Sequence, residues 1–104
     1  AVVLKGNPTV VAEGERLSVN PTGNPALATG GTGDVLSGAI AALLAAGLSP
    51  FDAARLGVFL HGLAGDLLAE EKEVGLLARE VAEALPRARR LLQEGRVPPA
   101  FFPR

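Results

Sequence analysis

The stretch Asn20-Pro-Thr-Gly-Asn-Pro-Ala-Leu-Ala-Thr-Gly-Gly-Thr-Gly-Asp-Val-Leu-Ser-Gly38 decides the fold of this chain. It opens with Pro, Gly and Asn, which interrupt regular structure, and therefore predicts a loop. It then passes through Gly30-Gly31-Thr32-Gly33 to a single acid, Asp34. Residues 35–46 are an almost unbroken apolar run, which predicts a helix that is buried on most sides.

A glycine-rich turn that leads into a helix is suited to binding an anion. The backbone N–H groups at a helix N-terminus point outwards and carry about half a positive charge. Taken alone, the turn is a weak signal, because its spacing is neither that of the P-loop nor that of the dinucleotide fingerprint. Asp34, also taken alone, would be explained as a residue that caps the helix.

Taken as a whole, residues 23–38 closely resemble the signature of the ADP- or ATP-dependent NAD(P)H-hydrate dehydratases. These enzymes belong to the ribokinase-like superfamily, which shares a Gly-x-Gly-Asp turn, here Gly31-Thr32-Gly33-Asp34. The resemblance implies an α/β fold of the ribokinase-like three-layer type. This chain would supply the C-terminal part of that domain, with short strands and a hairpin first and helices afterwards.

The first twenty residues predict strands. Residues 1–4 are a continuous apolar run, which is typical of a strand covered on both faces. Residues 9–12 and 17–19 are rich in β-branched residues and flank residues 13–16, which predicts a hairpin. We expect these strands to belong to a mainly parallel sheet. Because the chain starts without Met inside an apolar run, we expect residues 1–104 to be the C-terminal part of a longer domain.

The segment Lys5-Gly6-Asn7-Pro8-Thr9 follows the first predicted strand. On sequence alone it would be explained as a solvated turn. It matches the second nucleotide motif of the family that the chain resembles, which implies that Lys5, Gly6, Asn7, Pro8 and Thr9 contact the adenine nucleotide. The resemblance supports the assignments of Asn7 and Pro8 less strongly than the other three, because these two positions vary in the family.

Three further helices are expected after the glycine-rich turn and its helix. Ser49 as N-cap and Pro50 as first residue predict a helix that continues to about Glu71. Residues 77–85 predict another helix, and Pro86 is expected to start a last one that ends at Gly95. Residues 97–104, with three prolines, are expected to form a tail.

Two other features have a structural and a functional interpretation. His61 lies in His-Gly-Leu-Ala-Gly-Asp66, which also resembles the family, and it is best explained as a histidine that packs between helices. A lone His without a second ligand at metal spacing does not predict a metal site. The basic side chains near the C-terminus lack interleaved aromatic residues and are expected to form a solvated helix face; they are Arg87, Arg89, Arg90 and Arg96.

Composition excludes several classes of function. A chain of 104 residues allows one domain. The formal net charge is −1, which offers no electrostatic basis for binding nucleic acid or an acidic membrane. The absence of cysteine rules out disulfides and favours a cytoplasmic location. The sequence shows neither a signal peptide nor an apolar run of transmembrane length.

The resemblance implies a reaction in which hydrated NADH or NADPH, the S epimer, loses water at the expense of ADP or ATP. The amides of Gly31, Thr32 and Gly33 would form an anion hole for the transferring phosphoryl group, and Gly33 would also contact the nucleotide. Asp34 would bind the substrate hydroxyl and accept its proton. Mg²⁺ is expected to arrive with the nucleotide, since no all-protein site for it is visible.

Two other functions remain compatible with the residues. One is that of another ribokinase-like small-molecule kinase, such as a vitamin-precursor kinase, although the Asn20-x-Thr-Gly-Asn24 prelude favours the dehydratase. The other is a nucleotide-binding module without catalysis, against which Asp34 argues. We also expect a homo-oligomer or association with a missing N-terminal segment, so the isolated chain should self-associate and fail to catalyse.

Overall fold

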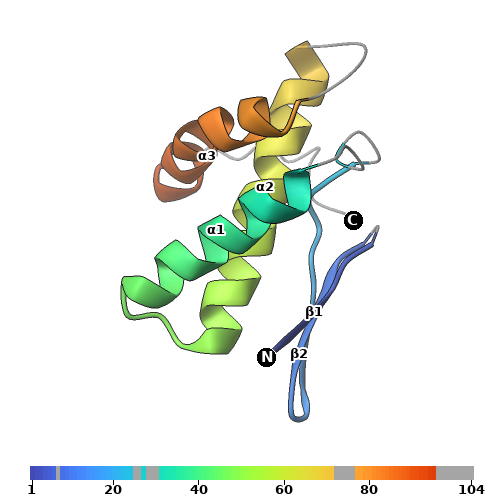
Figure 1. Ribbon diagram of the computed structural model, residues 1–104, viewed down its shortest axis with the longest axis vertical. Helices are drawn as coiled ribbons and strands as arrows, with labels where there is room; N and C mark the ends of the chain where they lie inside the picture. The colour runs from blue at the N-terminus through green and yellow to red at the C-terminus, as the bar shows by residue number, and fades with distance from the viewer. Residues whose placement is uncertain (7, 25–26, 28–30, 72–76, 96–104) are drawn as a thin grey trace.

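The computed structural model describes residues 1–6, 8–24, 27, 31–71 and 77–95 of the chain. The described part folds into a small sheet beside a group of helices (Figure 1). All strands precede all helices in the sequence, so the predicted α/β class and the predicted order of elements are confirmed. The elements are β1 (Val2–Leu4), β2 (Val10–Glu13), β3 (Arg16–Val19), α1 (Thr32–Ala45), α2 (Pro50–Glu71) and α3 (Ala78–Gln93).

The sheet has the strand order β1-β2-β3, and both pairings are antiparallel. Gly14 closes the predicted hairpin between β2 and β3 with a φ of 58°, in the left-handed region that glycine tolerates. The prediction of a mainly parallel sheet is wrong for these strands. Their connections are short, whereas a parallel pair needs a crossover of about a dozen residues or more.

The two faces of the sheet differ in what covers them. Val11 is fully buried and packs with Leu36 of α1 and with Phe51, Ala54 and Val58 of α2. On the other face Val2, Leu4, Leu17 and Val19 are 56% to 67% exposed, and their register places them together. We call these four residues the apolar sheet face. The prediction that residues 1–4 are covered on both faces is therefore wrong.

Helix α2 is the central helix of the described structure and packs against both α1 and α3 (Figure 1). It begins and ends where the sequence predicts, and the Ser49 hydroxyl oxygen accepts a hydrogen bond from the Asp52 N–H at 3.3 Å. A buried apolar cluster joins it to α3; the cluster consists of Leu60, Leu63, Ala64, Leu67, Leu68, Val81, Ala84 and Ala88. This long helix therefore holds the other elements in place.

Helix α1 starts directly after Gly31, whose φ is 91°. Residues 31–33 thus lie at a helix N-terminus, as the sequence predicts. The prediction that this helix is buried on most sides is wrong, because Thr32 and Leu36 are its buried residues and Leu44 is 43% exposed. A helix with apolar residues on every side is buried only where other elements pack against it. In the described structure α1 packs mainly against α2 and α3.

Helix α3 runs through Pro86 without a break, so the prediction of two separate helices is wrong. Proline removes one backbone hydrogen bond from a helix interior. Buried Val81, Ala84 and Ala88 lie on both sides of Pro86 and pack onto α2, which keeps the helix continuous. Gly95 follows its end with a φ of 67°, as expected for a C-terminal glycine.

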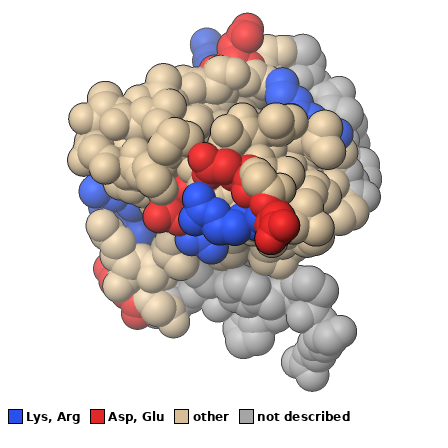
Figure 2. Space-filling model, turned by 90° about the horizontal axis from the view of Figure 1, so that it is seen from below, with Lys and Arg blue, Asp and Glu red and all other residues tan. Residues whose placement is uncertain are grey.

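On the face shown in Figure 2, charged side chains of both signs lie close together. Lysine and arginine lie next to acidic residues on the lower face (Figure 2). Arg16 pairs with Glu13 at 2.9 Å, and Arg55 pairs with Asp52 at 2.6 Å. Such exposed pairs contribute about 1 kcal/mol or less each. The charge pattern therefore gives no support to a docking surface for a polyanion.

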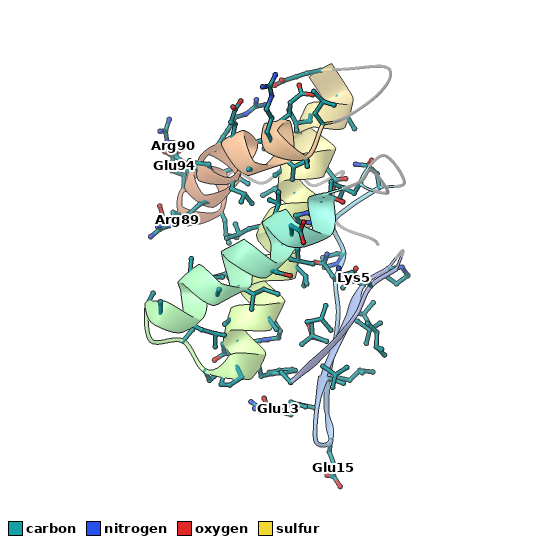
Figure 3. All side chains as sticks on the ribbon, in the orientation of Figure 1. Lys5, Glu13, Glu15, Arg89, Arg90 and Glu94 are labelled. Carbon is teal, nitrogen blue, oxygen red and sulfur yellow. The ribbon has the colours of Figure 1, made fainter. Side chains whose placement is uncertain are left out.

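The basic end of the chain lies on α3. Arg89 and Arg90 are exposed at the end of the helix, beside Glu94 and far from Lys5 (Figure 3). This placement agrees with the predicted solvated helix face; Arg96 and the predicted tail at residues 97–104 lie outside the described residues. Within the described part of the chain, no helix combines the length and hydrophobicity needed to span a bilayer.

Candidate functional site

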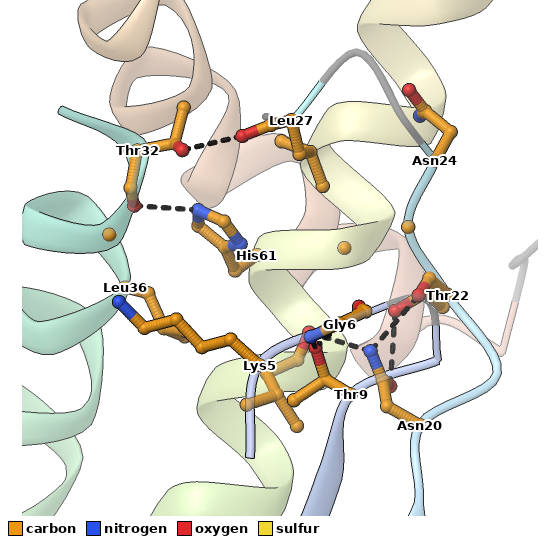
Figure 4. Close-up of a pocket in the computed structure, with 14 residues that line it drawn as sticks. Lys5, Gly6, Thr9, Asn20, Thr22, Asn24, Leu27, Thr32, Leu36 and His61 are labelled. Carbon is orange, nitrogen blue, oxygen red and sulfur yellow. Dashed lines mark hydrogen bonds between the residues drawn. The ribbon is translucent and has the colours of Figure 1, made fainter. Parts of the chain in front are cut away.

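A pocket of about 570 Å³ opens between the end of β1, the loop before α1, the first turn of α1 and the middle of α2 (Figure 4). It brings together segments that lie far apart in the sequence. Its lining residues are Lys5, Gly6, Thr9, Asn20, Thr22, Gly23, Asn24, Leu27, Thr32, Gly33, Leu36, Val58, His61 and Gly62.

The first turn of α1 contributes Thr32 and Gly33 to the lining of the pocket. The Gly31 carbonyl already accepts the N–H groups of Asp34 at 3.2 Å and Val35 at 3.3 Å. Gly31 is the N-cap residue and has no side chain that could cap the start of the helix. Thr32 is buried and donates its hydroxyl to the Leu27 carbonyl at 2.6 Å. The Thr32 side chain thus fixes the turn to the loop before α1.

Lys5 reaches from the end of β1 to this turn (Figure 4). A Cβ atom added to Gly33 would lie 2.6 Å from the Lys5 Nζ, so the ammonium group lies directly against the glycine. A positive charge and the positive end of a helix dipole therefore meet at one place. Both favour an anion, and a phosphate group satisfies both at once.

The segment after β1 forms a tight turn closed by Thr9. The Thr9 hydroxyl donates to the Gly6 carbonyl at 3.1 Å and lies 3.4 Å from the Gly6 N–H. The Thr9 carbonyl accepts the Asn20 N–H at 2.8 Å. This bond joins the turn to the loop that leads to α1. The two sequence motifs are therefore held in a fixed relation.

That loop is attached to α2 by two buried polar side chains. Asn20 donates its Nδ2 to the carbonyl of Val58 at 3.1 Å and to that of Thr22 at 3.0 Å. Thr22 donates its hydroxyl to the Phe59 carbonyl at 2.9 Å. Buried polar groups that are satisfied in this way rigidify a structure. The wall of the pocket opposite α1 is therefore well defined.

A second attachment uses Asp66 and a glycine of α2. The Asp66 carboxylate accepts the Gly23 N–H and the Asn24 Nδ2, each at 2.9 Å. One turn earlier, a Cβ atom at Gly62 would lie 2.2 Å from the Thr22 Oγ1. Only glycine at position 62 allows the loop to lie this close to the helix.

His61 connects α2 to the first turn of α1. Its ring is 8% exposed, and its Nε2 lies 3.0 Å from the Thr32 carbonyl oxygen. Burial lowers the pKa of His61 below its ordinary value, the bond to Thr32 opposes this, and the nearby Lys5 ammonium lowers it further. The predicted packing histidine is therefore found where it was expected, with an additional contact to the first turn of α1.

The structure gathers most of the candidate residues around the pocket. Lys5, Gly6, Thr9, Thr32 and Gly33 line it. Gly31 and Asp34 lie on the same first turn just outside the lining, and Pro8 is exposed in the turn after β1. Asn7 lies outside the described residues.

Sequence reasoning missed the side chains that hold the loop and the turn. They are Asn20, Thr22, Asn24 and Asp66. Sequence reasoning also missed the close approach of the loop at Gly62 and the contact of His61, a predicted packing histidine, with Thr32. The signals that pointed to them are the single histidine of the chain and the polar residues in Asn20-x-Thr-Gly-Asn24. Neither signal tells which helix these residues contact.

Among the described residues, no three His, Cys, Asp or Glu side chains form a group that could hold a metal ion. Mg²⁺ typically keeps several waters and binds through substrate phosphates plus one or two carboxylates. The exposed Asp34 carboxylate on the first turn of α1 is the acidic group closest in sequence to the candidate phosphate site. The residues present thus fit a Mg²⁺ ion that is carried by a nucleotide rather than one resident in the protein.

Residues 1–87 match a family model described as NAD(P)H-hydrate dehydratase. The bifunctional NAD(P)H-hydrate repair enzyme of Thermofilum pendens is 53% identical over 95 residues, which is 89% of this chain and 18% of that protein. The ADP-dependent (S)-NAD(P)H-hydrate dehydratase of Neisseria meningitidis is 50% identical over 86 residues, which is 80% of this chain and 29% of that protein.

A similar fold is present in a solved structure. The ADP/ATP-dependent NAD(P)H-hydrate dehydratase of Bacillus subtilis, co-crystallised with ATP and Mg²⁺, has a TM-score of 0.79 and 44% identity. The match covers 85% of this chain and 32% of the other. This likeness confirms the ribokinase-like α/β fold that the sequence predicts. The chain spans less than a third of the length of each of these three proteins.

Proposed function

The chain belongs to the NAD(P)H-hydrate dehydratase family, and from this we propose that it supplies the phosphate-binding part of an ADP- or ATP-dependent (S)-NAD(P)H-hydrate dehydratase. The observation that carries the proposal is the position of Lys5, whose Nζ lies against Gly33 at the N-terminus of α1. In this proposal residues 1–104 are the C-terminal part of a ribokinase-like domain. The rest of the domain supplies most contacts to the hydrated nicotinamide.

The proposed reaction converts a poor leaving group into a good one. Hydroxide leaves a carbon atom with difficulty, so the hydroxyl of the hydrate first attacks the terminal phosphoryl group of the nucleotide. A new bond forms between phosphorus and the hydroxyl oxygen, and the bond between phosphorus and the bridging oxygen of the nucleotide breaks, so that ADP leaves as AMP or ATP leaves as ADP. Loss of inorganic phosphate and of a proton from the substrate then restores the double bond of the reduced nicotinamide.

Each candidate residue has a separate task in the first step. The N–H groups of Gly31, Thr32 and Gly33 stabilise the charge on the oxygens of the transferring group. The Lys5 ammonium, which lies against Gly33, neutralises the same charge. Asp34 accepts the hydrogen bond, and then the proton, of the attacking hydroxyl. Mg²⁺, bound with the nucleotide, would neutralise phosphate charge during transfer.

The turn after β1 is proposed to hold the nucleotide. Gly6 and Thr9 keep the turn compact, and the resemblance of this segment to the family's nucleotide motif extends the assignment to Asn7 and Pro8. The Thr9 carbonyl ties the turn to the loop before α1 through Asn20. Nucleotide and phosphoryl group would therefore be held by parts of the chain that are bound to each other.

The apolar sheet face also bears on the proposal. Four exposed apolar side chains on one side of a small sheet are a surface that other protein covers. We assign this role to the remainder of the domain or to a second copy of the chain in a homo-oligomer. We also propose a cytoplasmic location, because both nucleotides used in the reaction are intracellular metabolites.

The test is regeneration of the reduced cofactor by the full-length protein that contains this sequence. With the S epimer of NADH hydrate, ADP or ATP and Mg²⁺, the absorbance of reduced nicotinamide should recover, and it should not recover without the nucleotide. The same experiment with NADPH hydrate defines the range of substrates. A full-length protein that binds ADP but regenerates neither cofactor would contradict the proposal.

A further inference from the structure

His61 and Thr32 form a contact that the proposed reaction does not yet use. They lie 29 positions apart, both are buried, and the His61 Nε2 is 3.0 Å from the Thr32 carbonyl oxygen. A carbonyl oxygen can only accept a hydrogen bond. The proton of the ring therefore resides on Nε2, which donates to Thr32.

The Thr32 carbonyl belongs to the same peptide group as the Gly33 N–H. A peptide group is planar and trans, so its N–H points away from its C=O, and fixing one fixes the other. In Figure 4 the histidine approaches the Thr32 carbonyl from α2, on the inner side of the turn. The opposite end of the same group is the N–H of Gly33, the residue against which the Lys5 Nζ lies.

Within the dehydratase activity proposed above, we propose that His61 is a positioning residue that fixes the Thr32–Gly33 peptide and thereby aims the Gly33 N–H at the transferring phosphoryl group. A donor on the carbonyl also polarises the peptide and strengthens its N–H as a donor, as in other chains of hydrogen bonds. His61 contacts neither substrate in this arrangement. It acts through the peptide alone.

The charges around the ring agree with a neutral donor. Among the described residues that line the pocket, Lys5 and His61 are the titratable ones. Lys5 faces His61 and lowers its pKa. Asp34 on α1 is exposed, and Asp66 on α2 binds Gly23 and Asn24; no charged residue of α3 lines the pocket. Burial lowers the pKa of His61, so the ring is neutral at neutral pH and adds no charge to the anion site.

Two amide variants of the full-length protein separate positioning from packing. In His61→Gln the side-chain Nε2 is as many bonds from Cβ as the histidine Nε2, so its N–H can reach Thr32. In His61→Asn the amide is one bond shorter and cannot reach the carbonyl. The two variants have the same chemistry and neither titrates, so they differ mainly in this hydrogen bond.

A hydrogen-bond donor that points in the wrong direction raises the free energy of the transition state more than that of the ground state. The reason is that charge on the phosphoryl oxygens develops in the transition state. We expect His61→Asn to lower kcat about tenfold or more while the KM for ADP changes less than about threefold. His61→Gln should stay within about threefold of the wild-type kcat. If His61→Asn keeps its kcat, or if His61→Gln loses as much as His61→Asn while both melt at the wild-type temperature, the proposal is wrong.

A second measurement does not depend on turnover and separates this inference from the proposed function. In ¹⁵N-labelled wild-type protein, inorganic phosphate or ADP should shift the Gly33 amide resonance and the His61 ring resonance together. The Gly33 amide should move upfield in His61→Asn and return in His61→Gln. If the ligand shifts the Gly33 amide resonance of the wild-type protein but not the His61 ring resonance, the positioning role is wrong. This result needs neither dehydratase activity nor a folded variant.

Discussion

Replacement of Gly62 by alanine tests the close approach of the loop to α2. The new Cβ would lie 2.2 Å from the Thr22 Oγ1, 2.7 Å from the Thr22 carbonyl carbon and 2.9 Å from the Gly23 nitrogen. An ordinary contact is 3.4 Å or longer. The loop must therefore retreat by about 1 Å, since two of the three atoms belong to the backbone and no rotamer change relieves them.

The magnitude follows from the bonds that this retreat breaks. The Thr22 hydroxyl would lose the Phe59 carbonyl and the Gly23 N–H would lose Asp66, each worth about 1 kcal/mol. Strain from overpacking adds about 1 to 3 kcal/mol. The higher helix propensity of alanine offsets about 1 kcal/mol of this loss in stability. We expect a net loss of about 2 to 4 kcal/mol in the free energy of unfolding.

The assay is thermal denaturation of the full-length protein, combined with hydrogen exchange at Gly23. At about 2 to 4 °C per kcal/mol for a domain of 150–250 residues, Gly62→Ala should lower Tm by roughly 4 to 16 °C. The Gly23 amide should exchange faster. Gly38→Ala is the matched control, because its Cβ would meet no atom within 4 Å. If Gly62→Ala proves as stable as Gly38→Ala, the close contact between loop and helix is not as described.

Three further outcomes are expected. Gly33→Val should raise the Kd for ADP about tenfold or more by calorimetry, because a Cβ there would lie 2.6 Å from the Lys5 Nζ and displace the ammonium; an unchanged Kd would remove Gly33 from the site. The lowered pKa of His61 means that the unfolded chain binds more protons, so stability should be complete above its ordinary pKa of about 6.5 and fall as the pH drops below it. This acid-side fall should be weaker in His61→Gln, and an equal fall would show that another group causes it. The isolated 104-residue chain should self-associate through the apolar sheet face. Leu17→Lys should reduce the mass measured by light scattering without lowering Tm, whereas Leu17→Val should leave the mass unchanged. A monomeric wild-type chain would contradict this prediction.

Local signals in the sequence were sufficient for several elements. Ser49 and Pro50 mark the start of α2, and the run of apolar residues at helical spacing leads to its observed end at Glu71. The hairpin follows from β-branched residues on both sides of Gly14. The glycine-rich turn lies at the N-terminus of α1 because glycine takes the positive φ that Gly31 requires.

Features that depend on distant partners were missed. Pro86 would start a helix on local grounds, but packing of Val81 and Ala88 onto α2 keeps one helix continuous across it. The exposure of α1 and of the apolar sheet face depends on which surfaces are present to cover them. For the same reason, one sequence could not show that His61 contacts Thr32, 29 residues away.

The role of Asp34 is the central claim, and one variant tests it most directly. Asp34→Asn keeps the size of the side chain and removes the proton acceptor at the first turn of α1. In the full-length protein, calorimetry should show ADP binding within about threefold of wild type, while regeneration of NADH from its hydrate falls by about a hundredfold or more. Near-normal turnover by Asp34→Asn would contradict the proposed chemistry.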